Sequence, residues 1–233
     1  MPVSRRVHNF AFAAAAAGAV ALSGCVPTQP EPTAPKPTPA SAEITVLFLG
    51  DSYTEGTGLT PDEVPLRWST QLAQQLGWRE INAGCNGSGY TRPGLRCGTT
   101  YEQRIALLTD PVPDVVVVSG GVNDLGASRE QIEADVAATY ATLRATFPEA
   151  TIYAVGGIYY TGSERPEVLQ FLNDAVRDAA EREGVVFIDI GEPLLGRPDL
   201  MAPDGLHPNP EGHTVIKDLT VAGLVPPHAV NAG

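Results

Sequence analysis

The chain has 233 residues, of which 43% are hydrophobic and 18% are charged, and this balance is typical of a globular domain and excludes a wholly disordered chain. Its formal net charge is −12 at pH 7, which disfavours nucleic acid and anionic lipid as electrostatic partners. We therefore expect no nucleic-acid partner.

Residues 1–24 have the pattern of an export signal. Arg5 and Arg6 precede an apolar stretch, residues 10–22, which is shorter than the roughly 20 residues of a bilayer-spanning helix. The stretch leads into "LSGC", in which Cys25 follows two small residues. This pattern resembles the lipobox of bacterial lipoproteins, whose cysteine is lipidated and becomes the first residue after cleavage. The resemblance implies an exported protein held at the outer face of the cell membrane by a lipid on Cys25.

Two alternative interpretations of the export signal at residues 1–24 stay open. It can be an ordinary signal peptide in which Cys25 is incidental. The paired arginines also hint at a twin-arginine signal, although the continuation typical of such signals is missing, so the export route is undecided.

Residues 25–42 are predicted to be a tether. Residues 26–41 contain six prolines and few apolar side chains, a composition that prevents helix, sheet or core formation. The folded domain is therefore expected to span residues 43–225, with a short C-terminal tail at residues 226–233.

The chain has three cysteines, an odd number that needs an explanation in an exported protein. If Cys25 carries a lipid, Cys85 and Cys97 are left as a pair. In an oxidising compartment these two thiols can close a short loop as a disulfide. Two independent buried thiols are the alternative.

Short β-branched runs alternate with longer amphipathic segments after residue 42, which predicts parallel strands joined by crossover helices. Some of the runs, such as "VVVV" at residues 115–118, are apolar throughout, as in a sheet buried on both faces. The pattern predicts an α/β fold, a three-layer α/β/α sandwich with a mostly parallel five-stranded sheet. The expected strands are residues 44–49, 79–82, 115–119, 152–155 and 185–188, and the expected helices are residues 66–76, 101–108, 129–147, 166–182 and 210–224.

Polar, glycine-rich segments follow the predicted strands. Because functional groups gather at the carboxyl ends of parallel strands, these segments are expected to meet at one edge of the sheet. They carry a hydroxyl, an amide, a carboxylate, an imidazole and several flexible backbone donors. The segments are "GDSYTEG" at residues 50–56, "NAGCNGSGY" at 82–90, "SGGVNDLG" at 119–126 and "DGLHPN" at 204–209.

These four motifs, in this order over roughly residues 44–224, resemble those of the SGNH, or GDSL, hydrolases. The resemblance implies a flavodoxin-like fold and places the nucleophile at Ser52, the base at His207 and the carboxylate that orients the base at Asp204. A serine hydroxyl attacks a carbonyl poorly unless an imidazole takes its proton, which explains why the chemistry needs these three residue types.

The resemblance also implies an oxyanion hole. The expected donors are the backbone N–H groups of Ser52 and Gly87 and the side-chain amide of Asn123, aimed at the negative charge that develops on the attacked carbonyl. Gly89 is the alternative to Gly87, because two glycines lie close together in this motif.

Each motif alone has a structural reading. Ser52 can cap a helix, Asn123 and Asp124 can form an Asx-turn, and His207 can mark a turn. Asp51 is expected to hold its loop by accepting hydrogen bonds. Trp68 is expected to be a packing residue, and no motif supports a catalytic role for His213. The occurrence of all four motifs in order is what favours catalysis.

The predicted activity is the hydrolysis of carboxylic esters of carbohydrates or lipids through an acyl-enzyme on Ser52. The alternatives are an O-acyltransferase that uses the same acyl-enzyme and a lipoprotein that binds envelope glycans without turnover. No P-loop, dinucleotide fingerprint or metal-ligand cluster occurs in the sequence, so neither an organic cofactor nor a metal is expected. The expected partners are an acyl-ester substrate and the membrane, and the expected oligomeric state is a monomer.

Overall fold

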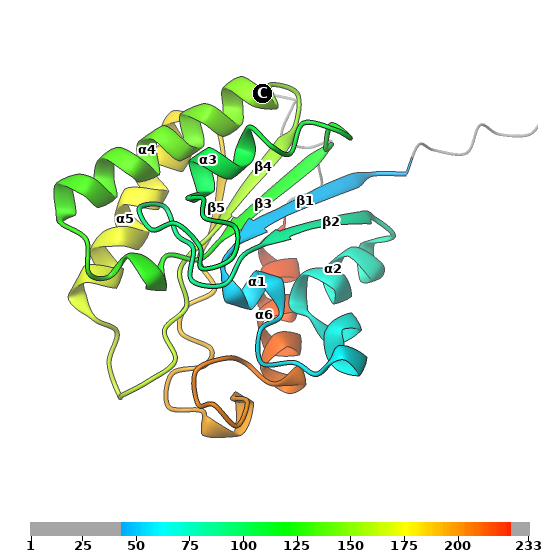
Figure 1. Cartoon of the computed structure of the whole chain (residues 1–233), viewed down its shortest axis with the longest axis vertical. Coiled ribbons are helices and arrows are strands. Elements are labelled where there is room, and N and C mark those ends of the chain that lie inside the picture. The colour runs from blue at the N-terminus through cyan, green and yellow to red at the C-terminus, as the bar shows by residue number, and fades with distance from the viewer. Residues whose placement is uncertain (1–42, 225–233) are drawn as a thin grey trace, which may run out of the picture. The chain divides into compact units, whose positions relative to one another are not determined.

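The computed structural model describes residues 43–224, in which a five-stranded sheet lies between two layers of helices (Figure 1). The strands run in the order β2-β1-β3-β4-β5 and every neighbouring pair is parallel. The predicted three-layer α/β/α fold is therefore confirmed. The strands are β1 (Thr45–Gly50), β2 (Arg79–Gly84), β3 (Val115–Ser119), β4 (Thr151–Val155) and β5 (Val186–Ile188).

Helices cover both faces of the sheet (Figure 1). One layer contains α2 (Trp68–Leu76) and α6 (Pro210–Gly223), and the other contains α3 (Tyr101–Ile105), α4 (Arg129–Thr146) and α5 (Glu167–Arg182). Each layer packs on its own hydrophobic cluster.

Strand β1 is apolar along almost its whole length because both of its faces are buried. Successive side chains of a strand point to opposite faces, so Leu47 and Leu49 join one cluster while Val46 and Phe48 join the other. All four side chains are at most 1% exposed. A central parallel strand has no solvent-facing side, and polar residues therefore appear only where the strand ends.

Several predicted boundaries shift. The predicted helix at residues 66–76 begins at Trp68, because a 3-10 helix, η1 (Pro61–Leu66), precedes it and contains Pro65, which has no N–H for an α-helical bond. The helix predicted at residues 101–108 ends at Ile105. A short helix that the sequence analysis did not predict, α1 (Ser52–Glu55), directly follows β1.

The chain path places a crevice beside β1. The connection from β1 leads outward to β2, and the next connection returns past β1 to β3, so the segments that follow β1 and β3 diverge at the carboxyl edge. Gly50 pairs in register with Gly84 on one side and with Ser119 on the other. The loops that follow these three strands therefore start at the same level of the sheet.

The predicted export signal, the lipobox residue Cys25, the tether and the C-terminal tail lie outside the described residues. Within residues 43–224, none of the helices combines the length and the apolar character that a membrane crossing requires.

Candidate active site

Ser52 lies at the first position of α1, immediately beyond the carboxyl end of β1. Ser52 is buried, with 7% of its surface exposed. The side chain of Asp51 caps the helix, and its Oδ1 accepts the N–H of Tyr53 at 3.0 Å. Burial raises the pKa of Asp51 to about 7. The expected loop-holding role of Asp51 is thus confirmed.

Gly50 is required by the close approach of α1 to the sheet. A Cβ at this position would lie 2.7 Å from the Cβ of Thr54 and 2.7 Å from the carbonyl oxygen of Ser119. Because neither atom can move away without shifting α1 or β3, a larger residue would displace the start of the helix that carries Ser52.

Asp204 and His207 form one hydrogen-bonded turn. The Oδ2 of Asp204 lies 2.7 Å from the Nδ1 of His207, and its Oδ1 accepts the backbone N–H groups of Leu206 at 2.9 Å and His207 at 3.0 Å. Partial burial of Asp204 opposes its ionisation, but the hydrogen bonds from His207 and Leu206 outweigh this and hold the pKa of the carboxyl at about 2. An ionised carboxylate at Nδ1 favours the tautomer that leaves Nε2 as the proton acceptor.

Ser52 and His207 line the same pocket, although they are 155 positions apart in the chain. His207 is 6% exposed. In the described part of the chain no hydrogen bond joins the Ser52 hydroxyl to the imidazole, and in enzymes without substrate such bonds are often long until the substrate binds. The pocket is lined by Asp51, Ser52, Tyr53, Asn86, Ser119, Gly120, Val122, Asn123, Ile158, Tyr160, Leu206 and His207.

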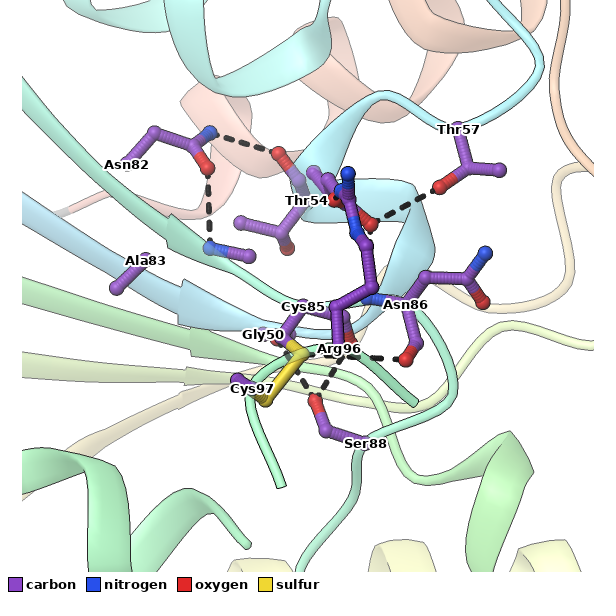
Figure 2. A network of polar contacts seen from close by, with 12 residues as sticks. Gly50, Thr54, Thr57, Asn82, Ala83, Cys85, Asn86, Ser88, Arg96 and Cys97 are labelled. Atoms are coloured by element: carbon purple, nitrogen blue, oxygen red, sulfur yellow. Dashed lines mark hydrogen bonds and ion pairs between the residues drawn. A yellow bond between two sulfur atoms is a disulfide. The ribbon is translucent and has the colours of Figure 1, made fainter. Parts of the chain in front are cut away.

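The loop after β2 is fastened at both ends. Cys85 and Cys97 form a disulfide, as predicted, with a Cα–Cα distance of 6.3 Å. Glu55 of α1 accepts the N–H of Asn86 at 2.8 Å and forms an ion pair with Arg96. Figure 2 shows Asn86 and Arg96 next to the two cysteines, in front of the segment that carries α1. The disulfide closes this loop on itself, and Glu55 ties the loop to the helix that begins with Ser52.

The two candidate glycines of this loop differ in their backbone N–H groups. Gly89 donates its N–H to the carbonyl of Arg92 at 2.9 Å, and a Cβ on Gly89 would meet the Asp124 carboxylate at 2.2 Å. The N–H of Gly87 has no acceptor among the described residues. Asn86, its neighbour, lines the pocket, whereas Gly87 itself does not. The geometry therefore favours Gly87 over Gly89 as a free donor.

Asn123 also lies in the pocket wall and follows β3. One of its two Nδ2 hydrogens is donated to the carbonyl of Ser88 at 2.9 Å. This bond fixes the amide plane and leaves the second hydrogen for another acceptor.

Asp124 holds the loop after β2, a role that the sequence analysis did not assign to it. Its carboxylate is buried and accepts the N–H groups of Tyr90 at 2.8 Å, Thr91 at 3.1 Å and Arg92 at 3.1 Å, as well as the Thr91 hydroxyl at 2.9 Å. Burial raises the pKa of Asp124. The only sequence signal was its position next to Asn123 in a motif, and its four donors come from a distant loop.

Arg104 of α3 was also missed. Its buried guanidinium donates to the carbonyl oxygens of Gly50 at 3.0 Å and Ala83 at 2.5 Å. These carbonyls stand at the ends of β1 and β2, so Arg104 holds together the two strand ends from which the Ser52 and Gly87 segments emerge. Burial lowers the pKa of the guanidinium.

Trp68 and His213 are packing residues, as expected. Trp68 is 1% exposed and His213 is fully buried, and the Nδ1 of His213 accepts the N–H of Trp68 at 3.3 Å. Within residues 43–224, no group of three or more His, Cys, Asp or Glu side chains has an arrangement suited to a metal ion.

Comparison with known proteins assigns the chain to a family. The sequence profile of the GDSL-like lipase/acylhydrolase family matches residues 48–215. The chain belongs to this family. A GDSL lipase of Mycobacterium tuberculosis is 30% identical over 186 residues, which cover 74% of this chain and 78% of that lipase.

Solved structures agree with the fold of a GDSL-like hydrolase. The crystal structure of TesA has a TM-score of 0.65 and 23% identity, and the match covers 78% of this chain and 99% of TesA. The esterase EstA from Pseudoalteromonas sp., in a structure inhibited by monoethylphosphonate, has a TM-score of 0.60 and 22% identity, with coverage of 78% and 96%. The chain is therefore an SGNH/GDSL-type hydrolase.

Proposed function

We propose that this GDSL-like hydrolase is an exported, lipid-anchored esterase that cleaves carboxylic esters through an acyl-enzyme on Ser52. The observation that carries the proposal is the meeting of Ser52 and His207 in one pocket, with the Asp204 carboxylate 2.7 Å from the Nδ1 of His207. This is the set of roles that nucleophilic ester hydrolysis requires.

In the first half of the reaction, the Ser52 hydroxyl oxygen attacks the acyl carbon of the ester. The hydroxyl proton passes to the Nε2 of His207, and the ionised Asp204 stabilises the resulting imidazolium through Nδ1. The carbonyl becomes an oxyanion. When the tetrahedral intermediate collapses, the bond to the alcohol breaks and the leaving oxygen takes the proton from His207.

In the second half, water attacks the acyl-enzyme. His207 accepts a proton from the water and returns it to the Ser52 oxygen as the carboxylic acid departs. An acyltransferase would differ only in that a substrate hydroxyl replaces water, and both reactions need the same three side chains.

The oxyanion is assigned to three donors. The backbone N–H groups of Ser52 and Gly87 have no acceptor among residues 43–224, and Asn123 has one amide hydrogen beyond the one donated to Ser88. Donors that are already oriented stabilise the developing charge without reorganisation.

The proposed substrates are acyl esters of envelope lipids or glycans. The related GDSL lipase of Mycobacterium tuberculosis supports a lipid ester. Val122, Ile158 and Leu206 supply an apolar part of the pocket wall, which suits an acyl chain, while Asn86 and Asn123 supply a polar part near the ester. The "LSGC" pattern at Cys25 supports placement at the outer face of the cell membrane, where esters of envelope lipids and glycans are accessible.

Activity is tested with residues 43–233 and p-nitrophenyl esters of several acyl lengths. Wild type should release p-nitrophenol and react with a fluorophosphonate probe, and Ser52→Ala should do neither. Ser128→Ala is a matched control, because Ser128 caps α4 by accepting the N–H of Gln131 at 3.2 Å and does not line the pocket. Equal inactivity of wild type and Ser52→Ala on all esters would favour the binding lipoprotein instead.

The anchor has its own test. The full chain should fractionate with membranes and incorporate a labelled fatty acid, and Cys25→Ala should lose both properties. A Cys25→Ala protein that still incorporates the label would refute lipidation at this residue.

A further inference from the structure

Tyr53 joins the segment of the proposed nucleophile to the segment of the proposed base. It is the residue after Ser52, and its hydroxyl donates a hydrogen bond of 2.8 Å to the carbonyl of Leu206, the residue before His207. The ring of Tyr53 also contacts the imidazole of His207 edge to face, with 6.1 Å between the ring centroids and 66° between the planes.

The other hydrogen bonds of the His207 turn are internal to its own region. The N–H groups of Leu206 and His207 are accepted by Asp204, and the carbonyl of His207 accepts the N–H of Ala202 at 2.7 Å. These bonds fix the shape of the turn and leave its distance from α1 undetermined. Among the hydrogen bonds of residues 43–224, only the one from the Tyr53 hydroxyl connects α1 to this turn.

The backbone of Tyr53 is held in place by a hydrogen bond. Its N–H is accepted by Asp51, which caps the helix that Ser52 begins. Gly58 also packs closely against His207, because a Cβ on Gly58 would lie 2.7 Å from the Cβ of His207. His207 therefore packs against both Tyr53 and Gly58.

We propose that Tyr53 is a positioning residue whose hydroxyl and ring hold the His207 imidazole at the distance from Ser52 that proton transfer requires. The inference rests on the proposed function. Small errors in such a distance are costly, since a displacement of about 1 Å can reduce the rate of an enzyme by roughly 100-fold.

The test is a pair of substitutions that remove the two contacts in turn. Tyr53→Phe keeps the ring and deletes the hydroxyl, and it should lower kcat about fivefold, the effect of one net hydrogen bond, while KM changes little. Tyr53→Leu deletes both contacts and should lower kcat further. The rate at which a small uncharged phosphonate reacts with Ser52 should fall in parallel with kcat, because that reaction also needs the base.

Tyr140→Phe is the matched control. The Tyr140 hydroxyl lies 3.0 Å from the Tyr90 hydroxyl in the core, and neither residue lines the pocket. Its loss should lower the melting temperature and leave kcat and the phosphonate rate unchanged. A purely structural role of Tyr53 would give the same pattern as this control.

The outcomes separate this inference from the proposed function. If Ser52→Ala is inactive while Tyr53→Phe keeps the wild-type kcat and phosphonate rate, Tyr53 is not a positioning residue. If Tyr53→Phe raises KM alone, Tyr53 contacts the substrate instead, and the inference is also overturned. Activity that persists in Ser52→Ala would refute the proposed function itself. Should Tyr53→Leu fail to fold, the kinetics of Tyr53→Phe decide.

Discussion

The Asp204 carboxylate contacts His207 twice, at the ring Nδ1 through Oδ2 at 2.7 Å and at the backbone N–H through Oδ1 at 3.0 Å. One side chain thus fixes both the turn and the imidazole that projects from it. A neutral replacement would keep the size of the side chain and change its hydrogen-bonding pattern.

Asp204→Asn should therefore reduce kcat by about 10³–10⁴-fold with a much smaller effect on KM, because an amide at this position favours the wrong tautomer of the ring. The measurement is steady-state hydrolysis of a p-nitrophenyl ester. Retention of more than a tenth of the activity would remove Asp204 from the proposed triad.

Asn123→Ala should lower kcat by about 10²–10³-fold, the usual cost of one oxyanion donor. The substitution also frees the carbonyl of Ser88, so the melting temperature must be recorded on the same sample. A loss of stability without a loss of kcat would show that Asn123 only supports the loop.

Glu55 offers a test of how the loop after β2 is held. Glu55→Ala should lower kcat several-fold and the melting temperature by roughly 3–6 °C, because the N–H of Asn86 loses its acceptor. Glu55→Gln should restore most of both, since an amide oxygen can still accept this bond.

Arg96→Gln is the control for Glu55. The Arg96 side chain is 76% exposed, and exposed ion pairs contribute little to stability. If Arg96→Gln reproduced the effect of Glu55→Ala, the ion pair and not the Asn86 hydrogen bond would hold the loop.

The disulfide should contribute about 2–4 kcal/mol to the free energy of unfolding, because it closes a loop between residues 12 positions apart and so restricts the unfolded chain. Replacement of Cys85 and Cys97 together by alanine, followed by urea unfolding, measures this contribution. The proposed oxyanion donor Gly87 lies within the loop, so kcat should fall as well. Unchanged stability and activity after replacement would exclude a structural role.

His213 predicts a specific pH dependence of stability. Burial, with the charges of Arg67 and His207, lowers its pKa to about 3, against an ordinary value of 6.5. As the pH falls from 6.5 toward 3, the unfolded chain takes up a proton that the folded protein does not. The free energy of unfolding contributed by His213 therefore falls by about 1.4 kcal/mol per pH unit in this window.

The comparison must be made against His213→Gln, because Asp51 acts in the opposite direction. The pKa of Asp51 is raised to about 7 in the folded protein, so between about pH 4 and pH 7 the folded protein holds a proton that the unfolded chain has lost. The contribution of Asp51 to the free energy of unfolding therefore falls as the pH rises through this range. The free energy of unfolding is measured by urea unfolding of wild type and His213→Gln at pH 7 and pH 5, and the effect of Asp51 cancels because both proteins contain it. Between pH 7 and pH 5, the free energy of unfolding of wild type should fall by about 2 kcal/mol more than that of the variant. Parallel losses would contradict the neutral, buried state of His213.

Local sequence determined the strands and the segments that follow them. Runs such as residues 115–118 are typical of a sheet buried on both faces, and glycine and polar residues follow where such runs end. The placement of Ser52, Asn123 and His207 at one edge of the sheet follows from that pattern, because parallel strands end on the same side. The count of thiols predicted the pairing of Cys85 with Cys97 but left two independent thiols as an alternative, and the structure decided for the disulfide.

Tertiary structure alone decided which side chains hold these segments together. The hydrogen bond from Tyr53 to Leu206 joins residues 153 positions apart, and the carboxylate of Asp124 reaches three successive N–H groups of a loop more than 30 residues away. Neither contact leaves a local pattern, because it depends on the order β2-β1-β3-β4-β5, which brings distant loops together. Periodicity records only which face of an element is buried, whereas the partner of a polar side chain is set by the chain path in space.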